Sequence, residues 1–337
     1  MYKNVLVTGG AGFIGSNFIP YFCEKYPDYH VINLDKLTYA GNLDNLKECE
    51  NFSNYSFIKG DICDTSFVLE VFEKHKITDV IHFAAESHVD NSISNPRAFI
   101  ETNVLGTFTL LETFRKKHKN SKQNRFHHIS TDEVYGTLGE TGYFSEKTAY
   151  APNSPYSASK AGSDMLVRAY FHTYGVNVVT SNCSNNYGPK QHSEKLIPTI
   201  IRHALAEEPI PIYGDGMNVR DWIYVIDHCK AVNLIFHGGI AGEIYNIGGH
   251  NEQNNLGIAQ KICEILDQKY RRKSGSYCKL ITFVTDRPGH DRRYAIDATK
   301  LKTELGWKAE ESFDSGIIKT VEWYSCEQRV VERKLTV

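Results

Sequence analysis

Short apolar runs alternate with longer helical patterns through the first half of the chain. Residues 4–8 form a short apolar run, whereas in residues 96–118 apolar side chains recur near one helical face. The pattern predicts strands at 4–8, 31–34, 55–58, 79–83, 126–130 and 176–181, and helices at 13–26, 67–75, 96–118 and 155–174. Such alternation implies right-handed crossovers and a parallel sheet covered by helices on both faces.

The alternation of apolar runs and helical patterns ends at about residue 182. Prolines and glycines break this half into short pieces, although residues 224–236 look like a strand–helix return to the first region. We therefore predict a first domain made of residues 1–181, with 224–245 returning to it, and a smaller, more irregular second domain made of 182–223 and 246–337.

Composition and charge exclude several classes of protein. Of the 337 residues, 41% are hydrophobic and 23% charged, which is typical of a globular chain rather than a disordered one. A formal net charge of −2 argues against a general nucleic-acid binder, and no apolar run reaches the roughly 18 residues of a membrane span. The eight cysteines are scattered without a Cys-x-x-Cys pair, so we expect reduced thiols and a cytoplasmic protein.

A glycine-rich segment at residues 8–15 (TGGAGFIG) follows the first predicted strand and opens the first predicted helix. Gly10, Gly12 and Gly15 fit G-x-G-x-x-G, and Gly9 with the last two fits G-x-x-G-x-x-G. Glycine here allows a tight turn, a close approach of the backbone to a pyrophosphate, and contact between helix and strand. The free N–H groups at the start of the helix would face an anion. Such a loop is also typical of a plain strand–helix turn, so its context decides.

The context of the glycine loop favours a dinucleotide. Asp35 ends the second strand, 20 residues past Gly15. At this position of a dinucleotide-binding motif, a carboxylate accepts hydrogen bonds from the ribose hydroxyls. Its carboxylate would repel a 2′-phosphate, which favours NAD over NADP, although the neighbouring Lys36 weakens that inference slightly. Asp61-Ile62 could hold the adenine or form a solvated turn, and Phe83-Ala84-Ala85 supplies small residues near a cofactor. The sequence therefore predicts an α/β fold with a Rossmann-type doubly wound parallel sheet, and a smaller α+β substrate-binding domain.

Tyr156 and Lys160 are four residues apart in the helix predicted at 155–174, so they lie one turn apart on one face. For a tyrosine to act as a base near pH 7, its pKa of about 10 must fall by about 3 units, or roughly 4 kcal/mol. An ammonium at about 4 Å offers a similar amount, and an oxidised nicotinamide adds further positive charge. Exposed helices carry many such pairs, but behind an NAD motif we interpret this one as catalytic.

These motifs together resemble the extended short-chain dehydrogenase/reductase superfamily. The resemblance rests on residues 8–15, on Asp35 and on residues 156–160 (YSASK). The motifs do not choose among epimerases, dehydratases, decarboxylases and reductases of nucleotide sugars.

Residues 130–136 (STDEVYG) discriminate among these reactions. Asp132 and Glu133 follow the fifth strand at the sheet edge where an open α/β sheet places its site, although a solvated turn is the commonest use of such a pair. If NAD oxidises a sugar at C4, the C5 proton becomes acidic and the C6 hydroxyl can leave. A charged carboxyl can then remove the C5 proton, and a protonated neighbour can donate a proton to the leaving C6 hydroxyl. The repulsion between two adjacent carboxylates raises the pKa of one of them.

This segment, together with residues 85–90 (AESHVD), resembles the dTDP-glucose 4,6-dehydratases. Further matching segments lie at 36–42, 182–189, 195–198, 220–222, 245–249 and 286–294, so the match covers nearly the whole chain. Two segments depart from the expected pattern: residues 190–193 (KQHS) replace aromatic and proline residues, and Asn91 stands where arginine is common.

The resemblance implies a role for each catalytic residue. Tyr156 takes the C4 hydroxyl proton while hydride passes from C4 to NAD, and Thr131 hydrogen-bonds the same oxygen. Glu133 then removes the C5 proton, and Asp132 protonates the leaving hydroxyl. The hydride returns to C6, leaving a 4-keto-6-deoxy sugar, and Lys160 holds the nicotinamide ribose. NAD is regenerated in each turnover and should stay bound.

The resemblance also implies the binding residues. The cofactor contacts are Gly9, Gly12, Phe13, Ile14, Gly15, Asp35, Lys36, Thr38, Gly41, Asp61, Ile62, Phe83, Ala84, Ala85, Asn103, Tyr156, Lys160 and Asn186. The substrate contacts are Ser87, Thr131, Asn185, Lys195, Leu196, Pro211, Tyr213, Arg220, Asn255, Asp286, Arg287 and His290. Arg220 also makes sense independently, since a guanidinium fork matches a diphosphate, although a surface ion pair with Asp221 or Asp215 would use it too.

We expect no metal site, because the histidines show no His-x-x-x-His spacing. A homodimer that pairs the helices beginning at Pro96 and Pro155 is implied by the resemblance. The alternatives are another NAD-dependent nucleotide-sugar enzyme, namely a 4-epimerase, a decarboxylase or a UDP-sugar 4,6-dehydratase, and a non-catalytic NAD-sensing protein. An epimerase has no use for Asp132 and Glu133 as acid and base, and a sensor can dispense with Tyr156 and Lys160.

Overall fold

A seven-stranded parallel sheet forms the centre of the larger lobe. The computed structural model describes residues 3–335 except 120, 271 and 287, and their side chains through Cys326. The strands lie in the order β10-β6-β5-β4-β1-β2-β3. Their bounds are β1 (Lys3–Thr8), β2 (Tyr29–Asp35), β3 (Tyr55–Lys59), β4 (Asp79–His82), β5 (Phe126–Thr131), β6 (Val178–Cys183) and β10 (Ile244–Ile247). The predicted doubly wound fold is confirmed, and β10 extends the expected six strands by one.

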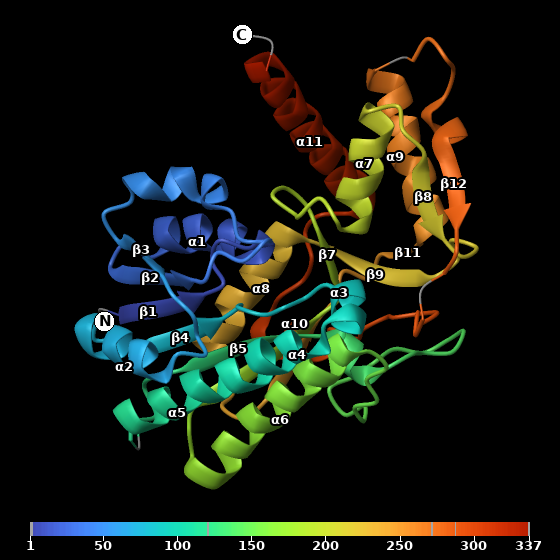
Figure 1. The fold of residues 1–337 in the computed structure, drawn as a ribbon. Helices are drawn as coiled ribbons and strands as arrows, with labels where there is room; N and C mark the ends of the chain where they lie inside the picture. The colour runs from blue at the N-terminus through green and yellow to red at the C-terminus, as the bar shows by residue number, and fades with distance from the viewer. Residues whose placement is uncertain (1–2, 120, 271, 287, 336–337) are drawn as a thin grey trace.

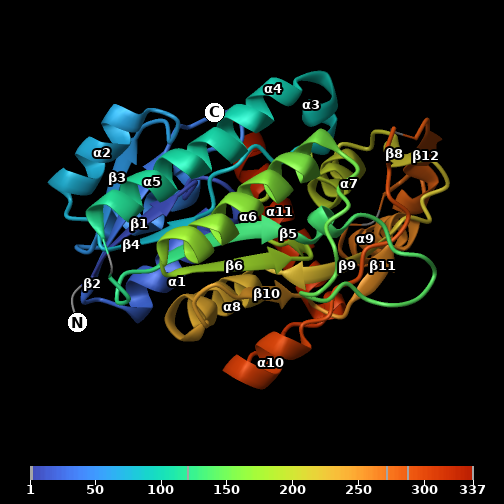
Figure 2. The same ribbon diagram turned by 90° about the horizontal axis from the view of Figure 1, so that it is seen from below.

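The strands are buried on both faces because helices cover each side. Along β1, Val5 and Val7 point into one core and Leu6 into the other, as strand geometry requires. The first core contains apolar residues of α1 (Phe13–Lys25) and α8 (Val225–Gly238). The second contains residues of α2 (Thr65–Lys74), α5 (Thr107–Lys117) and α6 (Pro155–Tyr174). Figure 2 shows the two helical layers with the sheet between them.

The helix predicted over residues 96–118 is interrupted by a π-helical segment. It consists of α4 (Pro96–Phe99), the π-helical η2 (Ile100–Gly106) and then α5. Phe99 and Phe114 are buried as the apolar pattern suggests, but Phe108 is 43% exposed. A π turn takes more residues than an α turn, so it rotates the face that follows. The apolar spacing of residues 96–118 therefore predicts a continuous α-helix where the structure has a π-helical interruption.

The smaller lobe is built from short strands and three helices beside the larger sheet (Figure 1). One sheet has the order β11-β9-β7 and another pairs β12 with β8. Tyr187, Ile200, Ile262 and Ile317 lie in its core. The bounds are β7 (Asn185–Tyr187), β8 (Ile210–Tyr213), β9 (Val219–Tyr224), β11 (Glu252–Asn254), β12 (Ile281–Val284), α7 (Leu196–Leu205), α9 (Asn255–Lys269) and α11 (Phe313–Leu335).

Several short elements lie in the connections between these strands and helices. They are η1 (Leu43–Asn51), α3 (Val89–Ser94), η3 (Asp132–Tyr135), η4 (Tyr277–Leu280) and α10 (Thr299–Leu305). Late in the chain, Leu301 and Trp307 pack into the core under the larger sheet, and Trp307 Nε1 donates to the Asp227 carbonyl at 3.2 Å. All eight cysteines are free thiols. Among the described residues, no helix has the length and apolar character that crossing a membrane would require.

Candidate active site

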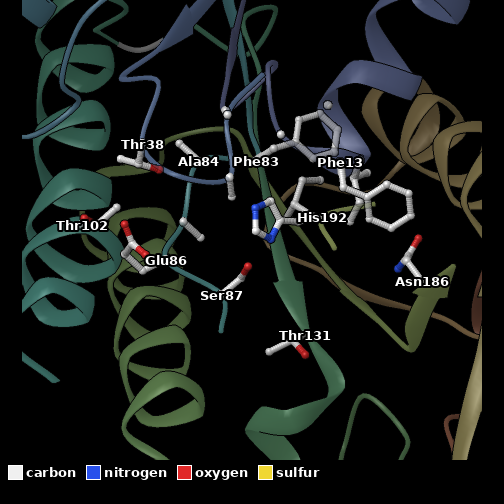
Figure 3. A pocket seen from close by; sticks show the side chains of 18 of the residues that line it. Phe13, Thr38, Phe83, Ala84, Glu86, Ser87, Thr102, Thr131, Asn186 and His192 are labelled. Atoms are coloured by element: carbon white, nitrogen blue, oxygen red, sulfur yellow. The ribbon is translucent and has the colours of Figure 1, made fainter. Parts of the chain in front are cut away.

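A cavity of about 310 Å³ opens at the carboxyl ends of β1, β2, β4, β5 and β6. This is the edge where the strand order reverses between β1 and β4, and where open α/β sheets bind their ligands. Most of the predicted site residues line it: Gly9, Gly12, Phe13, Ile14, Gly15, Asp35, Lys36, Thr38, Gly41, Asp61, Ile62, Phe83, Ala84, Ala85, Ser87, Thr131, Asp132, Glu133, Tyr156, Lys160, Asn185, Asn186 and Lys195. Figure 3 shows part of this lining.

The glycine loop is shaped by contacts that leave no room for a side chain. Gly9 has φ +73°, and a Cβ there would lie 2.5 Å from the Ala84 nitrogen. A Cβ on Gly15 would lie 2.5 Å from the Gly9 carbonyl oxygen. Gly12 precedes α1 without any side-chain cap, so the amides of the first turn remain open to an anion. The loop therefore forms the cradle that a pyrophosphate needs.

Asp35 is held in place at the end of β2 by two backbone amides. Ala11 N–H donates to its Oδ2 at 2.9 Å and Leu37 N–H to its Oδ1 at 2.8 Å. Burial still raises the pKa of this carboxyl above its ordinary value, against the effect of both amides. Lys36, which could have attracted a 2′-phosphate, forms an ion pair with Asp61 at 2.7 Å. The pocket therefore suits the two ribose hydroxyls of NAD.

The two adjacent acids lie in different environments. Thr131 ends β5 and caps the start of η3. Its Oγ1 accepts a hydrogen bond from Glu133 N–H at 3.3 Å. Asp132 is 1% exposed, and its Oδ2 has no hydrogen-bond partner. Burial, then the charges of Glu133 and Asp221, raise the pKa of Asp132 well above its ordinary value. The environment of Asp132 thus favours its protonated form, whereas Glu133 is half-buried at the cavity wall.

Tyr156 and Lys160 lie in the first turns of α6. Ser154 and Ser157 form a capping box and Pro155 occupies the first turn, which explains why the helix starts there. Lys160 Nζ donates to the Ile129 carbonyl of β5 at 2.8 Å, and burial lowers the pKa of this amine.

The surroundings of Tyr156 act against its ionisation in the protein alone. Burial, followed by the charge of Glu133, raises the pKa of Tyr156 well above its ordinary value. The Lys160 amine is turned to the backbone of β5. That Lys160 lowers the pKa of Tyr156 therefore stays a prediction, and an oxidised nicotinamide beside the ring would add positive charge in the same direction.

Some predicted residues do not line the cavity: Asn103, Leu196, Pro211, Tyr213, Arg220, Asn255, Asp286 and His290. Arg287 lies outside the described residues. Asn103 is buried behind the wall, where its Oδ1 accepts from Glu86 N–H at 2.9 Å and its Nδ2 donates to Ser159 Oγ at 2.8 Å. It therefore supports the backbone of Glu86 rather than facing the cavity.

Arg220 is buried in the smaller lobe. Its guanidinium lies 4.2 Å from the centre of the Tyr294 ring, and Nη2 donates to the Asp291 carbonyl at 2.8 Å. The alternative partner Asp215 instead pairs with Arg292 at 2.9 Å. The predicted surface ion pair with Asp215 is therefore not formed.

Three further predicted residues gather beside β8 and β12, apart from the cavity lining. His290 Nδ1 lies 2.6 Å from Asp286 Oδ1, and the rings of His290 and Tyr213 are 6.4 Å apart. Gly214, with φ +57°, leaves space for Asp286, since a Cβ there would lie 2.9 Å from its Oδ2. The structure thus groups Tyr213, Asp286 and His290 but does not bring them to the catalytic side chains.

The sequence reasoning missed several residues that line the cavity: Glu86, Thr102, Cys183, Ser184, Gln191, His192 and Glu194. Three of these lie in residues 189–195, which we call the crossing segment. Figure 3 shows the His192 ring among the side chains of the cavity. The departure noticed at residues 190–193 was the one signal in the sequence that pointed to this segment.

The crossing segment is bonded to both sides of the cavity. On the Rossmann side, Tyr39 Oη donates to Glu194 Oε1 at 3.1 Å, and Lys190 Nζ donates to the Ser16 carbonyl at 3.1 Å. On the other side, Tyr324 Oη donates to the Gln191 carbonyl. The segment therefore bridges the cavity beside the predicted NAD site.

Comparisons with known proteins agree with this site. The family described as "GDP-mannose 4,6 dehydratase" matches residues 6–320. A protein named dTDP-glucose 4,6-dehydratase from Xanthomonas campestris pv. campestris (strain B100) is 55% identical over 333 residues, covering 97% of this chain and 94% of the relative.

Solved structures are similar over the same extent. The dTDP-glucose 4,6-dehydratase of Bacillus anthracis, in complex with NAD, has a TM-score of 0.87 at 46% identity and covers 97% of this chain and 98% of its own. That of Streptomyces venezuelae, with NAD and TYD bound, has a TM-score of 0.88 at 44% identity, with 98% of each chain covered.

We predict that Tyr39→Phe releases NAD faster. The change removes the hydrogen bond to the Glu194 carboxylate but keeps the ring against His192, whose centroid is 5.3 Å away. A hydrogen bond to a charged group contributes about 1.5 kcal/mol or more, so the dissociation rate should rise roughly tenfold. NAD retained by the protein after gel filtration, quantified by chromatography, measures this.

The matched control is Tyr174→Phe, at the exposed end of α6. It should retain NAD as the unmodified protein does. Equal retention by Tyr39→Phe and the control would mean that the crossing segment does not hold the cofactor.

Proposed function

The chain belongs to the dTDP-glucose 4,6-dehydratases of the extended short-chain dehydrogenase/reductase superfamily, and we propose the residue roles of its reaction from that premise. It is a hydro-lyase that converts dTDP-glucose into dTDP-4-keto-6-deoxyglucose with NAD as its cofactor. The observation that carries the assignment of roles is the pair of acids at the end of β5. They share one cavity with the glycine loop, and burial raises the pKa of Asp132.

The first step is oxidation at C4. Tyr156 takes the proton of the C4 hydroxyl, and Thr131, at the end of β5, hydrogen-bonds the same oxygen. Lys160 binds the nicotinamide ribose while the Ile129 carbonyl holds its amine. Bound NAD accepts a hydride from C4 and later donates it to C6. Because burial raises the pKa of Tyr156, the hydroxyl loses its proton only when positive charge is next to it.

The second step is elimination of water across C5 and C6. The C4 ketone makes the C5 proton acidic, and Glu133, the more exposed carboxylate, removes it. Asp132 protonates the C6 hydroxyl as it leaves, since burial keeps the carboxyl in its acid form at neutral pH. Its Oδ2, buried without a partner, is suited to this proton transfer. An epimerase would leave both acids unused.

We propose that the substrate is bound largely by residues of the second lobe. Ser87, Asn185 and Lys195 line the cavity near the acids and would contact sugar and diphosphate. Arg220 does not line the cavity, but its charge acts on the Asp132 carboxyl, so we propose that it binds the diphosphate together with Lys195. The group Tyr213, Asp286 and His290 would hold the nucleoside. This proposal places the nucleotide between the two lobes.

We retain the two-domain division as a proposal: NAD binding by residues 1–181 with 224–245, and nucleotide-sugar binding by 182–223 and 246–337. The pairing of β10 with β6 supports the return at 224–245. The packing of α10 against α8 and β10 shows that the later part also touches the larger sheet. The free thiols favour the reducing cytoplasm.

A homodimer through α5 and α6 is also proposed. The outer sides of η2, α5 and α6 expose four large apolar residues: Ile100 (48%), Leu105 (52%), Phe108 (43%) and Met165 (48%). These three elements pack against one another, and large apolar side chains exposed on neighbouring helices are typical of a protein interface. The rotation introduced by η2 is what brings Phe108 to this outer surface.

The overall reaction can be tested with dTDP-glucose that carries deuterium at C4. We expect a product that has lost one water and carries the label at C6, because the hydride removed in the first step returns in the last. Mass spectrometry and NMR of the product measure both. A product of unchanged mass would indicate epimerisation, and no conversion at all would refute the assigned activity.

Asp132→Asn should separate the two steps. The amide keeps the shape of the side chain but cannot protonate the leaving hydroxyl, so elimination should slow by about 10² to 10⁴ while C4 oxidation continues. Absorbance of reduced cofactor and product formation, followed in single turnover, distinguish the steps. Asp314→Asn, an exposed acid on α11 paired with Lys261, is the control and should change neither. Undiminished water loss in Asp132→Asn would remove the residue from this role.

Phe108→Glu should dissociate the dimer. A buried glutamate at a two-fold contact would be desolvated and repelled by its copy, so the variant should run as a monomer. Light scattering coupled to gel filtration gives the mass. Phe283→Glu on β12, where the side chain is 58% exposed, is the matched control and should leave the mass unchanged. A monomeric unmodified protein, or a dimeric Phe108→Glu, would contradict the proposed interface.

A further inference from the structure

A buried carboxylate lies one turn beyond Lys160 on α6 and has no role in the reaction described above. Asp164 is 3% exposed. Its Oδ2 accepts hydrogen bonds from Ser130 Oγ at 2.9 Å and Tyr150 Oη at 3.0 Å. Its Oδ1 lies 3.1 Å from Nε2 of His128, a fully buried ring. Both carboxylate oxygens of Asp164 therefore have hydrogen-bond partners, which come from β5 and from the loop before α6.

These contacts join the two elements that carry the catalytic side chains. Ser130 directly precedes Thr131 on β5, and Asp164 lies two turns from Tyr156 on α6. The bond from Lys160 Nζ to the Ile129 carbonyl crosses the same junction. Hydrogen bonds at this junction thus set where the tyrosine and lysine lie relative to the end of β5.

Asp164 also supplies negative charge to Lys160. Burial lowers the pKa of the Lys160 amine, and the Asp164 charge is the largest effect opposing this. The other titratable groups that face Asp164 and Lys160 supply little charge. Burial lowers the pKa of His128 well below its ordinary value, so the ring is neutral, and His82 on β4, 5.4 Å away, is neutral for the same reason.

The remaining neighbours are weak acids that stay protonated. Burial raises the pKa of the Cys183 thiol on β6 to about 12, and burial with the Asp164 charge raises the pKa of Tyr150. Burial also raises the pKa of Asp164 itself, to about 6, with Lys160 opposing the rise. The carboxyl is consequently ionised above that pH, and its support of the ammonium is present from neutral pH upward.

We propose that Asp164 is a positioning residue of the dehydratase: its hydrogen bonds fix α6 against β5, and, one turn from Lys160 on the same helix, it places a negative charge beside that amine in a buried site. The proposal rests on the proposed function, in which Lys160 binds the nicotinamide ribose. Asp164 itself touches neither the sugar nor the cofactor in this scheme.

The test is Asp164→Asn, measured as the pH dependence of kcat with dTDP-glucose. The amide keeps the shape of the carboxylate and an oxygen that accepts from Ser130 and Tyr150, but it removes the charge. The pKa of Lys160 should then fall further, so the alkaline limb of kcat should move to lower pH by roughly one unit or more. KM for dTDP-glucose should stay within about twofold, because the substrate contacts are unchanged.

Tyr150→Phe is the matched control. It removes one hydrogen bond from the same Oδ2 and leaves the charge, so it should lower thermal stability slightly without moving the alkaline limb. If Asp164→Asn does not fold, Asp164→Ser, which leaves room for a water between the same donors, carries the same expectation. Failure of both to fold would make Asp164 a purely structural group and overturn the proposal.

The remaining outcomes separate the two hypotheses. An unmodified protein that does not dehydrate dTDP-glucose at any pH would refute the proposed function. An active unmodified protein, together with an Asp164→Asn variant whose alkaline limb is unmoved, would refute the role of Asp164 and leave the function intact.

Discussion

The hydrogen bond from Lys160 Nζ to the Ile129 carbonyl joins α6 to β5, and the catalytic chemistry depends on that junction. Thr131, Asp132 and Glu133 end the strand, and Tyr156 and Lys160 begin the helix. This bond and the hydrogen bonds of Asp164 to Ser130 and His128 hold the strand against the helix, so one junction places five side chains at once. The parallel sheet makes this possible, since its strands deliver their carboxyl ends to one edge.

Burial at that edge determines the protonation states. The same exclusion of water raises the pKa of Asp132, lowers that of Lys160 and raises that of Tyr156. In the proposed mechanism these shifts favour Asp132 as an acid, whereas they oppose ionisation of Tyr156. Positive charge beside Tyr156 would lower its pKa, so the mechanism ties proton removal from C4 to the presence of the oxidised cofactor.

The dinucleotide site was predictable because each requirement is local. A tight strand–helix turn needs glycine at Gly9 and Gly15, and a strand must deliver Asp35 a fixed distance later. The π-helical η2 was not predictable, because the apolar spacing of residues 96–118 fits an α-helix almost as well. The crossing segment was not predictable either, since its bonds join Tyr39 and Tyr324 to residues far away in the chain.

The sequence by itself determined the fold class, the cofactor and the family, because glycine turns, strand ends and a Tyr-x-x-x-Lys turn are short-range features. It also supplied the two neighbouring acids. Only the tertiary structure decided that Asp132 is the buried acid whose pKa is raised, where the Lys160 amine points, and that Asn103 lies behind the cavity wall. Those properties depend on burial and on partners from distant segments, and neither can be read from the residues next to a group.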